Sequence, residues 1–211
     1  RFFVNNYSRV DTLPASVLRN AEGEVVTPLQ TADLSGLQDA GWAMPAPFSV
    51  KAADGVTDLY GVMYKPFDFD PDKQYPIVTY VYPGPQTEAV PKSFTAGGDE
   101  AALAQFGFIV VVMGHRGGHP DRSRWYHTYG YGNLRDYALE DKKAALEQLA
   151  ARHAFIDLDR VGIYGHSGGG FMTTAALLQY PDFFKVGVAS SGNHENDIYN
   201  RWWSETHHGV E

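Results

Sequence analysis

Apolar and polar positions alternate in two different ways along the chain. Up to about residue 45, short apolar runs are separated by turn residues, and "NAEGE" at 20–24 predicts a hairpin turn between two strands. From about Phe48 onward, strongly apolar runs alternate with longer segments of helical periodicity. The first pattern, up to about residue 45, predicts a piece of an all-β domain that is too short to be a complete domain. The second predicts an α/β fold with a mainly parallel sheet.

The elements of the second part follow from their apolar patterns. The run "FGFIVVVMG" at 106–114 is apolar almost throughout, which is typical of a strand buried on both faces of a parallel sheet. Asp99 is expected to cap the first helix, and Ala138, Ala145 and Leu149 share one face of the second. The predicted elements are strands 58–66, 75–85, 107–113, 160–165 and 184–192 and helices 98–107, 133–153 and 169–181.

The composition supports a folded domain and narrows the class of partner. Apolar residues make up 44% of the 211 residues, enough for a sizeable packed core. The net charge of −8 repels nucleic acid, so a small or peptidic substrate is expected instead. The absence of cysteine excludes disulfides and thiolate metal sites. No apolar run approaches the ~18 residues of a membrane span.

One glycine-rich stretch, "GIYGHSGGGFMTT" at 162–174, carries the strongest chemical signal. It contains G-x-S-x-G as Gly165, Ser167 and Gly169 between a predicted strand and a predicted helix, the context of a nucleophile elbow. Such a turn strains the serine backbone, requires small neighbours and lifts Oγ to the carboxyl end of the sheet. The amide of Gly168 would point to the same spot and stabilise an oxyanion.

Plainer interpretations of Ser167 stay open, and its partners are missing. An ordinary N-cap serine needs no chemistry, whereas a phosphate loop is disfavoured because no lysine follows the glycines. A nucleophilic serine needs a carboxylate and a histidine later in the chain. About 44 residues follow Ser167, and we expect the chain to end before both partners. The acids and histidines considered in that stretch are Asp182, Asp197, His194, His207 and His208.

Three other patterns receive structural interpretations. His115, His119 and His127 do not share a helix face and lack an H-E-x-x-H pattern, so we predict no metal site but a polar loop above the sheet. The aromatic run at 124–132 is interpreted as a domain-packing surface rather than a platform for nucleic-acid stacking, because the net charge is acidic. The charged run "EDKK" at 140–143 is expected to be a solvated helix face. No cofactor is expected.

Several stretches together resemble the dipeptidyl peptidase IV branch of the prolyl oligopeptidase family. "DLDRVGIYGHSGGGFMT" (157–173) is similar to the nucleophile segment, and "VYPGPQ" (81–86) resembles the V-Y-x-G-P motif. "GHRGGHPDRSRWYH" (114–127) and "FFKVGVASSGNHENDIYNRWWSETHHG" (183–209) resemble an R-G segment before a helix and the segment of the substrate-pocket aromatics. The resemblance covers nearly all of the chain.

This resemblance implies a β-propeller followed by an α/β-hydrolase domain. Residues 1–45 then correspond to the end of the propeller and a linker, and residues 46–211 to a hydrolase domain that is incomplete at its C-terminus. It implies that Ser167 attacks the scissile carbonyl and that the Tyr82 hydroxyl and the Gly168 amide form the oxyanion hole. Without the resemblance, Tyr82 would be interpreted as a core aromatic before a Pro-Gly turn.

The resemblance also implies a proline pocket between two aromatic side chains, here Tyr199 and Trp203. Trp203 departs from the tyrosine common at its position, and the larger indole makes the preference for proline less secure. A helix face of buried aromatics would explain the same residues without a ligand. The amine-anchoring glutamates of the family lie in propeller parts that this chain does not contain, so exopeptidase activity rests on analogy.

We therefore expect a serine peptidase that removes Xaa-Pro or Xaa-Ala dipeptides from peptide N-termini through an acyl-enzyme, with the fragment alone inactive. An acylaminoacyl peptidase or oligopeptidase, an esterase and a catalytically dead binding homologue are the alternatives. Peptide is the expected partner, and nucleic acid and a membrane span within the fragment are not expected. A homodimer of the full-length protein and a bacterial periplasmic or cytoplasmic location stay open.

Overall fold

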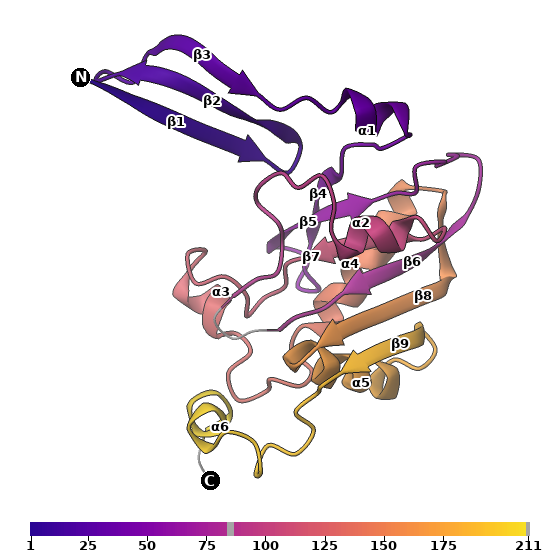
Figure 1. The fold of residues 1–211 in the computed structure, drawn as a ribbon. Helices are drawn as coiled ribbons and strands as arrows, with labels where there is room; N and C mark the ends of the chain where they lie inside the picture. Colours follow the sequence, from indigo (N-terminus) through magenta and orange to yellow (C-terminus); the bar gives the residue numbers. More distant parts are fainter. Residues whose placement is uncertain (84–86, 210–211) are drawn as a thin grey trace.

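In the computed structural model, which describes residues 1–83 and 87–209, the chain forms two sheets (Figure 1). The first is antiparallel, has the order β1-β2-β3 and projects from the rest of the molecule. Its strands are β1 (Phe2–Arg9), β2 (Thr12–Asn20) and β3 (Val25–Thr31). The predicted hairpin turn at 20–24 is confirmed, since the Gly23 amide donates to the Asn20 carbonyl (3.1 Å) and Gly23 has a φ of 86°.

The second sheet has six strands in the order β4-β5-β7-β6-β8-β9. They are β4 (Ala46–Lys51), β5 (Asp58–Tyr64), β6 (Tyr75–Tyr80), β7 (Ile109–Met113), β8 (Ile156–His166) and β9 (Phe184–Ser190). The last four run parallel, whereas β4 and β5 add antiparallel pairs at one edge. All five residues of β7 are buried, as its apolar run predicted. The expected α/β fold with a mainly parallel sheet is thus confirmed.

Helices cover both faces of this sheet. The helices are α1 (Ser35–Asp39), α2 (Asp99–Ala104), α3 (Arg124–Thr128), α4 (Leu139–Arg152), α5 (Gly168–Gln179) and α6 (Arg201–His208). On one face α4 and α5 bury the main core, which includes the predicted Ala138, Ala145 and Leu149. On the other, α2 packs over β5 and β7. Among the described helices, none has both the length and the hydropathy needed to cross a bilayer.

Two helix starts differ from the prediction. Asp99 is the first helical residue of α2 rather than its cap, because Gly98 enters the helix with a φ of 143° that favours glycine. The Asp99 carboxylate still lies in the first turn, where the helix dipole favours an anion. The second helix begins at Leu139 instead of near residue 133, because turns bury Leu134 and Tyr137 in the core before it starts.

The "EDKK" run contains a buried ionic cluster, so the predicted solvated face is wrong there. Asp141 is fully buried and accepts from Arg116 Nη2 (2.7 Å) and from the backbone N–H groups of Arg116 (2.9 Å) and Ala53 (3.0 Å). Lys142 is 1% exposed and donates from Nζ to the Met113 carbonyl. Because each buried charge has a partner, the cluster ties the end of β7 to α4.

Lys142 makes the stability of the protein depend on pH in a defined window. Burial is the largest effect on its amine and lowers the pKa from 10.5 to about 8. Between these values the unfolded chain binds a proton that the folded chain has lost, so the free energy of unfolding rises with pH. Urea unfolding across pH 7–11 is expected to show this rise in the wild type, and Lys142→Met removes it. Lys143→Met, on the exposed ion pair with Glu147, serves as the control and keeps the rise.

Candidate active site

The turn between β8 and α5 holds one serine in a strained backbone conformation. Ser167 has φ 56° and ψ −122°, and it is one of two non-glycine residues with positive φ among those described. A Cβ placed on Gly165 would lie 2.4 Å from the Val81 carbonyl oxygen, and one on Gly169 would lie 2.1 Å from the same atom. Both positions therefore require glycine, and the strained turn predicted from G-x-S-x-G is observed.

Among residues 1–83 and 87–209, nothing in the fold uses the hydroxyl of Ser167. The backbone is held on both sides, because its N–H donates to the Ser190 carbonyl (2.8 Å) and its carbonyl accepts from the Phe171 amide (3.0 Å). The half-buried side chain makes no capping hydrogen bond to α5, and within residues 1–83 and 87–209 its Oγ has no hydrogen-bond partner. The interpretation of Ser167 as an ordinary N-cap is therefore not supported, and Oγ is available for chemistry.

Tyr82 follows the neighbouring strand β6 and lies beside this turn. The Val81 amide donates to the Tyr164 carbonyl (2.9 Å), which continues the pairing of β6 with β8. A Cβ on Gly169 would lie 3.6 Å from the Tyr82 Cα, so the backbones of the two segments approach within van der Waals distance. The side chain of Tyr82 is half-buried. Residues 84–85 of the V-Y-x-G-P motif lie outside the described residues.

Tyr199 and Trp203 come together after β9. The Asn200 side chain caps α6 by accepting from the Trp203 amide (3.3 Å), which places Trp203 in the first turn with Tyr199 just before it. Their ring centroids lie 5.5 Å apart with planes at 88°. Tyr199 is 46% exposed, whereas Trp203 packs against the main core. The pair therefore presents one exposed ring that rests on one anchored ring.

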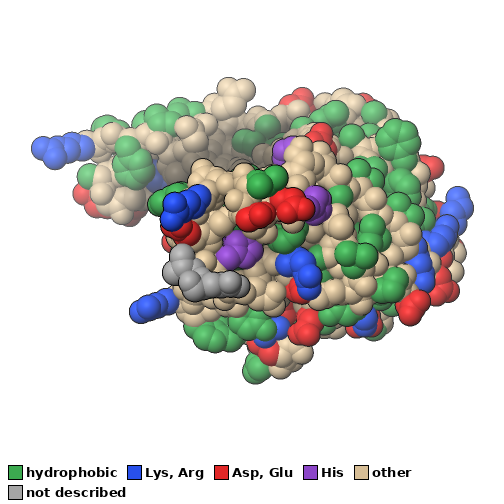
Figure 2. Space-filling model, turned by 90° about the horizontal axis from the view of Figure 1, so that it is seen from below, with side chains coloured by type: hydrophobic (Ala, Val, Ile, Leu, Met, Phe, Trp, Pro, Cys, Tyr) green, Lys and Arg blue, Asp and Glu red, His purple; other side chains and the backbone are tan. Residues whose placement is uncertain are grey.

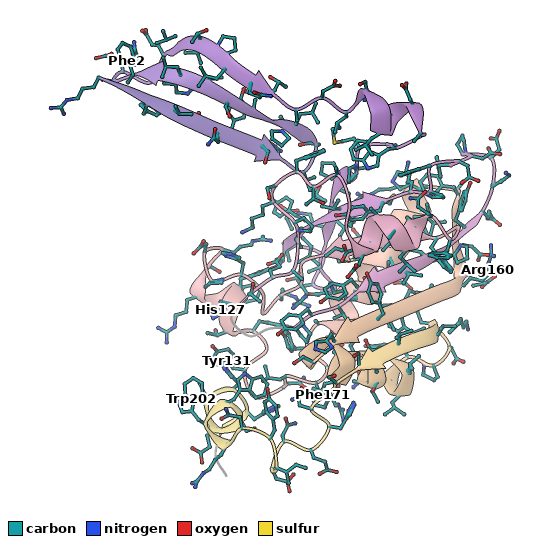
Figure 3. The ribbon with its side chains drawn as sticks, in the orientation of Figure 1. Phe2, His127, Tyr131, Arg160, Phe171 and Trp202 are labelled. Atoms are coloured by element: carbon teal, nitrogen blue, oxygen red, sulfur yellow. The ribbon has the colours of Figure 1, made fainter. Side chains whose placement is uncertain are left out.

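A row of rings holds α6 against the segment around α3 (Figure 3). The His207 ring lies 5.1 Å from Trp203 and 5.5 Å from Tyr131, and the His127 ring lies 6.0 Å from Tyr131. The His207 carbonyl also accepts from the Gly132 amide (3.1 Å). Burial is the largest effect on His207 and lowers its pKa, so a neutral imidazole is favoured. Part of the aromatic run at 124–132 thus packs on α6, whereas its predicted role as a domain-packing surface stays a prediction.

The remaining predicted histidines lie apart from one another. His115 is buried beside Tyr137, with Nε2 and the phenol oxygen 3.5 Å apart, so the predicted polar loop above the sheet is wrong for this residue. His119 and His127 are half-buried, and Nδ1 of His127 lies 2.8 Å from the Gly118 carbonyl oxygen. Within the described residues, no group of three or more histidine or acidic side chains is placed to hold a metal ion.

Comparisons with known proteins place these features in one family. The profile of the prolyl oligopeptidase family matches residues 95–210, more than half of the chain. Human dipeptidyl peptidase 8 is 38% identical over 149 residues, which cover 70% of this chain and 16% of that protein. A probable dipeptidyl-aminopeptidase B of Aspergillus clavatus is 30% identical over 92% of this chain and 21% of its own length. The chain therefore spans about a fifth or less of these relatives.

Solved structures agree with the sequence relatives. A putative dipeptidyl aminopeptidase IV from Bacteroides ovatus superposes with a TM-score of 0.83 at 30% identity, over 99% of this chain and 30% of that chain. Dipeptidyl peptidase 4 from Porphyromonas gingivalis superposes with a TM-score of 0.79 at 24% identity, over 99% of this chain and 30% of its own, and supports the fold alone. The family predicted from the sequence motifs is confirmed: the chain belongs to the prolyl oligopeptidase family.

Proposed function

We propose that this chain carries the nucleophile and part of the substrate site of a serine peptidase that releases dipeptides from peptide N-termini. The observation that carries the proposal is the strained Ser167, whose Oγ has no hydrogen-bond partner among the described residues although its backbone is fixed on both sides. A nucleophile elbow has this combination at a strand-to-helix turn with glycine neighbours. The names of the relatives support the dipeptidyl specificity.

In the proposed reaction, Ser167 Oγ attacks the carbonyl carbon before the scissile bond and gives its proton to a histidine base. The resulting oxyanion accepts hydrogen bonds from the Gly168 amide and the Tyr82 hydroxyl. Collapse of this intermediate breaks the C–N bond, and the histidine returns the proton to the departing amine. Water then attacks the acyl-enzyme by the same route, which releases the dipeptide and restores the serine.

The histidine and its carboxylate partner are proposed to follow Glu211 in a longer protein. The rings of His207 and His208 pack on Trp203, with centroids 5.1 and 5.6 Å from the indole. We likewise propose that residues 1–45 are the end of a propeller domain and residues 46–211 a part of the hydrolase domain. The structural match over 99% of this chain to a dipeptidyl aminopeptidase supports this division.

The acyl side of the substrate is proposed to bind against Tyr199 and Trp203. Two perpendicular rings offer an apolar corner for a small side chain such as proline or alanine. The Trp203 indole is larger than a tyrosine ring, so it leaves less space beside Tyr199 than a second tyrosine would. We therefore propose Xaa-Pro and Xaa-Ala peptides as substrates of the full-length protein, with the free amino terminus bound outside this chain.

The role of Ser167 is tested by covalent labelling of the full-length protein. A fluorophosphonate probe is expected to label one site, and Ser167→Ala is expected to abolish both the label and the hydrolysis of Ala-Pro-p-nitroanilide. Ser191→Ala, at the other serine with positive φ, is the matched control and keeps both signals. Labelling that persists in Ser167→Ala contradicts the assignment.

The role of Tyr82 is tested by removal of one oxygen atom. Tyr82→Phe keeps the ring but deletes the donor, so the oxyanion loses about 2.7–4 kcal/mol of stabilisation, or a 10²–10³-fold fall in kcat with little change in KM. Tyr80→Phe, two residues earlier on β6, is the control and keeps kcat. A fall in Tyr82→Phe that appears only as a raised KM contradicts an oxyanion role.

The row of rings that holds α6 is expected to set the preference for the residue before the scissile bond. Its members are Trp203, His207, Tyr131 and His127. Tyr131→Ala removes the support of His207 and, through it, of Trp203, so KM for Xaa-Pro substrates rises about tenfold while KM for Xaa-Ala changes less. Trp202→Ala alters the neighbouring residue of α6, which is 70% exposed, and serves as the control. Equal losses for both substrates and a lowered unfolding temperature would show that Tyr131 has a general structural role instead.

A further inference from the structure

A cleft of about 530 Å³ lies where the three-stranded sheet meets the larger sheet. Its walls come from the β1–β2 turn around Val10, from β4 and β5, and from two loops at residues 88–92 and 119–122. Viewed from below, the molecule is hollowed between the projecting N-terminal sheet and the main body (Figure 2). None of the roles proposed above uses this cleft.

The cleft opens at the same edge of the sheet as Ser167. The Gly114 amide, at the carboxyl end of β7, donates to the Tyr60 carbonyl (2.9 Å), so Tyr60 lies at that edge. Glu88 reaches the same place, because a Cβ on Gly114 would collide with its carboxylate. From β7 the strand order leads through β6 to β8, which is two steps of about 4.8 Å. About 10 Å therefore separates the Glu88 carboxylate at the end of β7 from the strand that ends at Ser167, and one further step, about 14 Å in all, separates Tyr60 on β5 from it. These distances are the span of roughly three to four extended residues.

The order of strands also decides which part of a substrate reaches the cleft. Tyr199 and Trp203, the proposed contacts for the acyl side, belong to the segment around α6, which follows β9 and lies at the opposite end of the molecule from the three-stranded sheet (Figure 1). Seen from Ser167, the cleft lies beyond β6 and β7, beside the three-stranded sheet. A peptide that places its acyl side against Tyr199 and crosses Ser167 along the sheet edge directs its leaving part toward the cleft.

The formal charges of the residues that line the cleft balance, with three basic and three acidic side chains, but the acids are engaged by neighbouring groups of the protein. Asp11 pairs with Arg9 (3.4 Å), and Asp121 lies beside the His119 ring (3.6 Å). Glu88 accepts from the His119 amide (3.0 Å) and from the Tyr126 hydroxyl (3.3 Å).

The basic side chains Arg122 and Lys92 are held differently from the acids of the cleft. The Arg122 guanidinium stacks between two rings, 4.3 Å from the centroid of Tyr126 and 5.2 Å from that of Tyr60. Within the described residues, neither Arg122 nor Lys92 forms an ion pair, and both line the cleft. Stacking orients the planar guanidinium and leaves its N–H groups available to a carboxylate.

We propose that this cleft binds the leaving part of the peptide substrate and that Arg122, assisted by Lys92, selects a carboxylate two or three residues after the scissile bond. The carboxylate is an acidic side chain or the C-terminus of a short peptide. This inference rests on the proposed peptidase function and assigns that function a second, leaving-side determinant of specificity.

The test uses the full-length protein and three substrates: Ala-Pro-p-nitroanilide, which has no leaving peptide, and the peptides Ala-Pro-Ala-Asp-Ala-amide and Ala-Pro-Ala-Asn-Ala-amide. The wild type is expected to cleave the Asp peptide about three- to tenfold faster, in kcat/KM, than the Asn peptide. Arg122→Gln abolishes this preference and leaves the p-nitroanilide rate unchanged, which also shows that the variant folds. Arg124→Gln, an exposed arginine two residues away that does not line the cleft, keeps the preference.

The outcomes separate the two proposals. If the wild type hydrolyses the p-nitroanilide but shows no preference for Asp, or if the preference survives in Arg122→Gln, the cleft does not select the leaving peptide. If none of the three substrates is cleaved, the proposed peptidase function fails and the leaving-side role fails with it. A preference in the wild type that falls at high salt and disappears in Arg122→Gln supports the assignment, since an exposed ion pair is screened by salt.

Discussion

The close approach of two backbone segments is the constraint on which the site depends. The turn around Ser167 touches the end of β6 so tightly that Gly165 and Gly169 have no room for a Cβ beside the Val81 carbonyl. Gly170 is confined in the same way, because a Cβ there would lie 2.4 Å from the Ser190 carbonyl oxygen. The serine is therefore placed by backbone contacts with the strands on both sides, and its side chain makes no capping hydrogen bond to α5.

The parallel sheet supplies the rest of the arrangement. Because the strands from β7 to β9 end at one edge, residues far apart in the sequence converge there: Tyr82 after β6, His115 after β7 and Ser167 after β8. The loop after β7 is anchored to α4 by the buried ion pair of Arg116 and Asp141. A charge pair in the core contributes little net stability, but the loss of one partner leaves the other unpaired, so the pair fixes one arrangement of this loop.

The sequence predicted most of the fold because its signals are local. The buried run of β7, the turn at 20–24 and the glycines around Ser167 each depend on residues close together in the chain. Features that depend on distant partners were misjudged or missed. The charges of Asp141 and Lys142 look solvated on a helix and become buried only through Arg116 and Met113. The docking of α6 on Tyr131, and the stacking of Arg122 between Tyr60 and Tyr126, likewise join segments whose proximity no periodicity reveals.

The segments on the two sides of Ser167 meet at α3. The rings of His127 in α3 and of Tyr131 just after it hold α6 on one side. Tyr126 of α3 stacks on Arg122 and donates to Glu88 in the cleft on the other side. Between them stands a turn whose position is set by glycines and backbone hydrogen bonds. Evolution or an engineer can therefore change one flank alone only at side chains away from α3, because a change in α3 reaches both flanks, while the serine stays where it is.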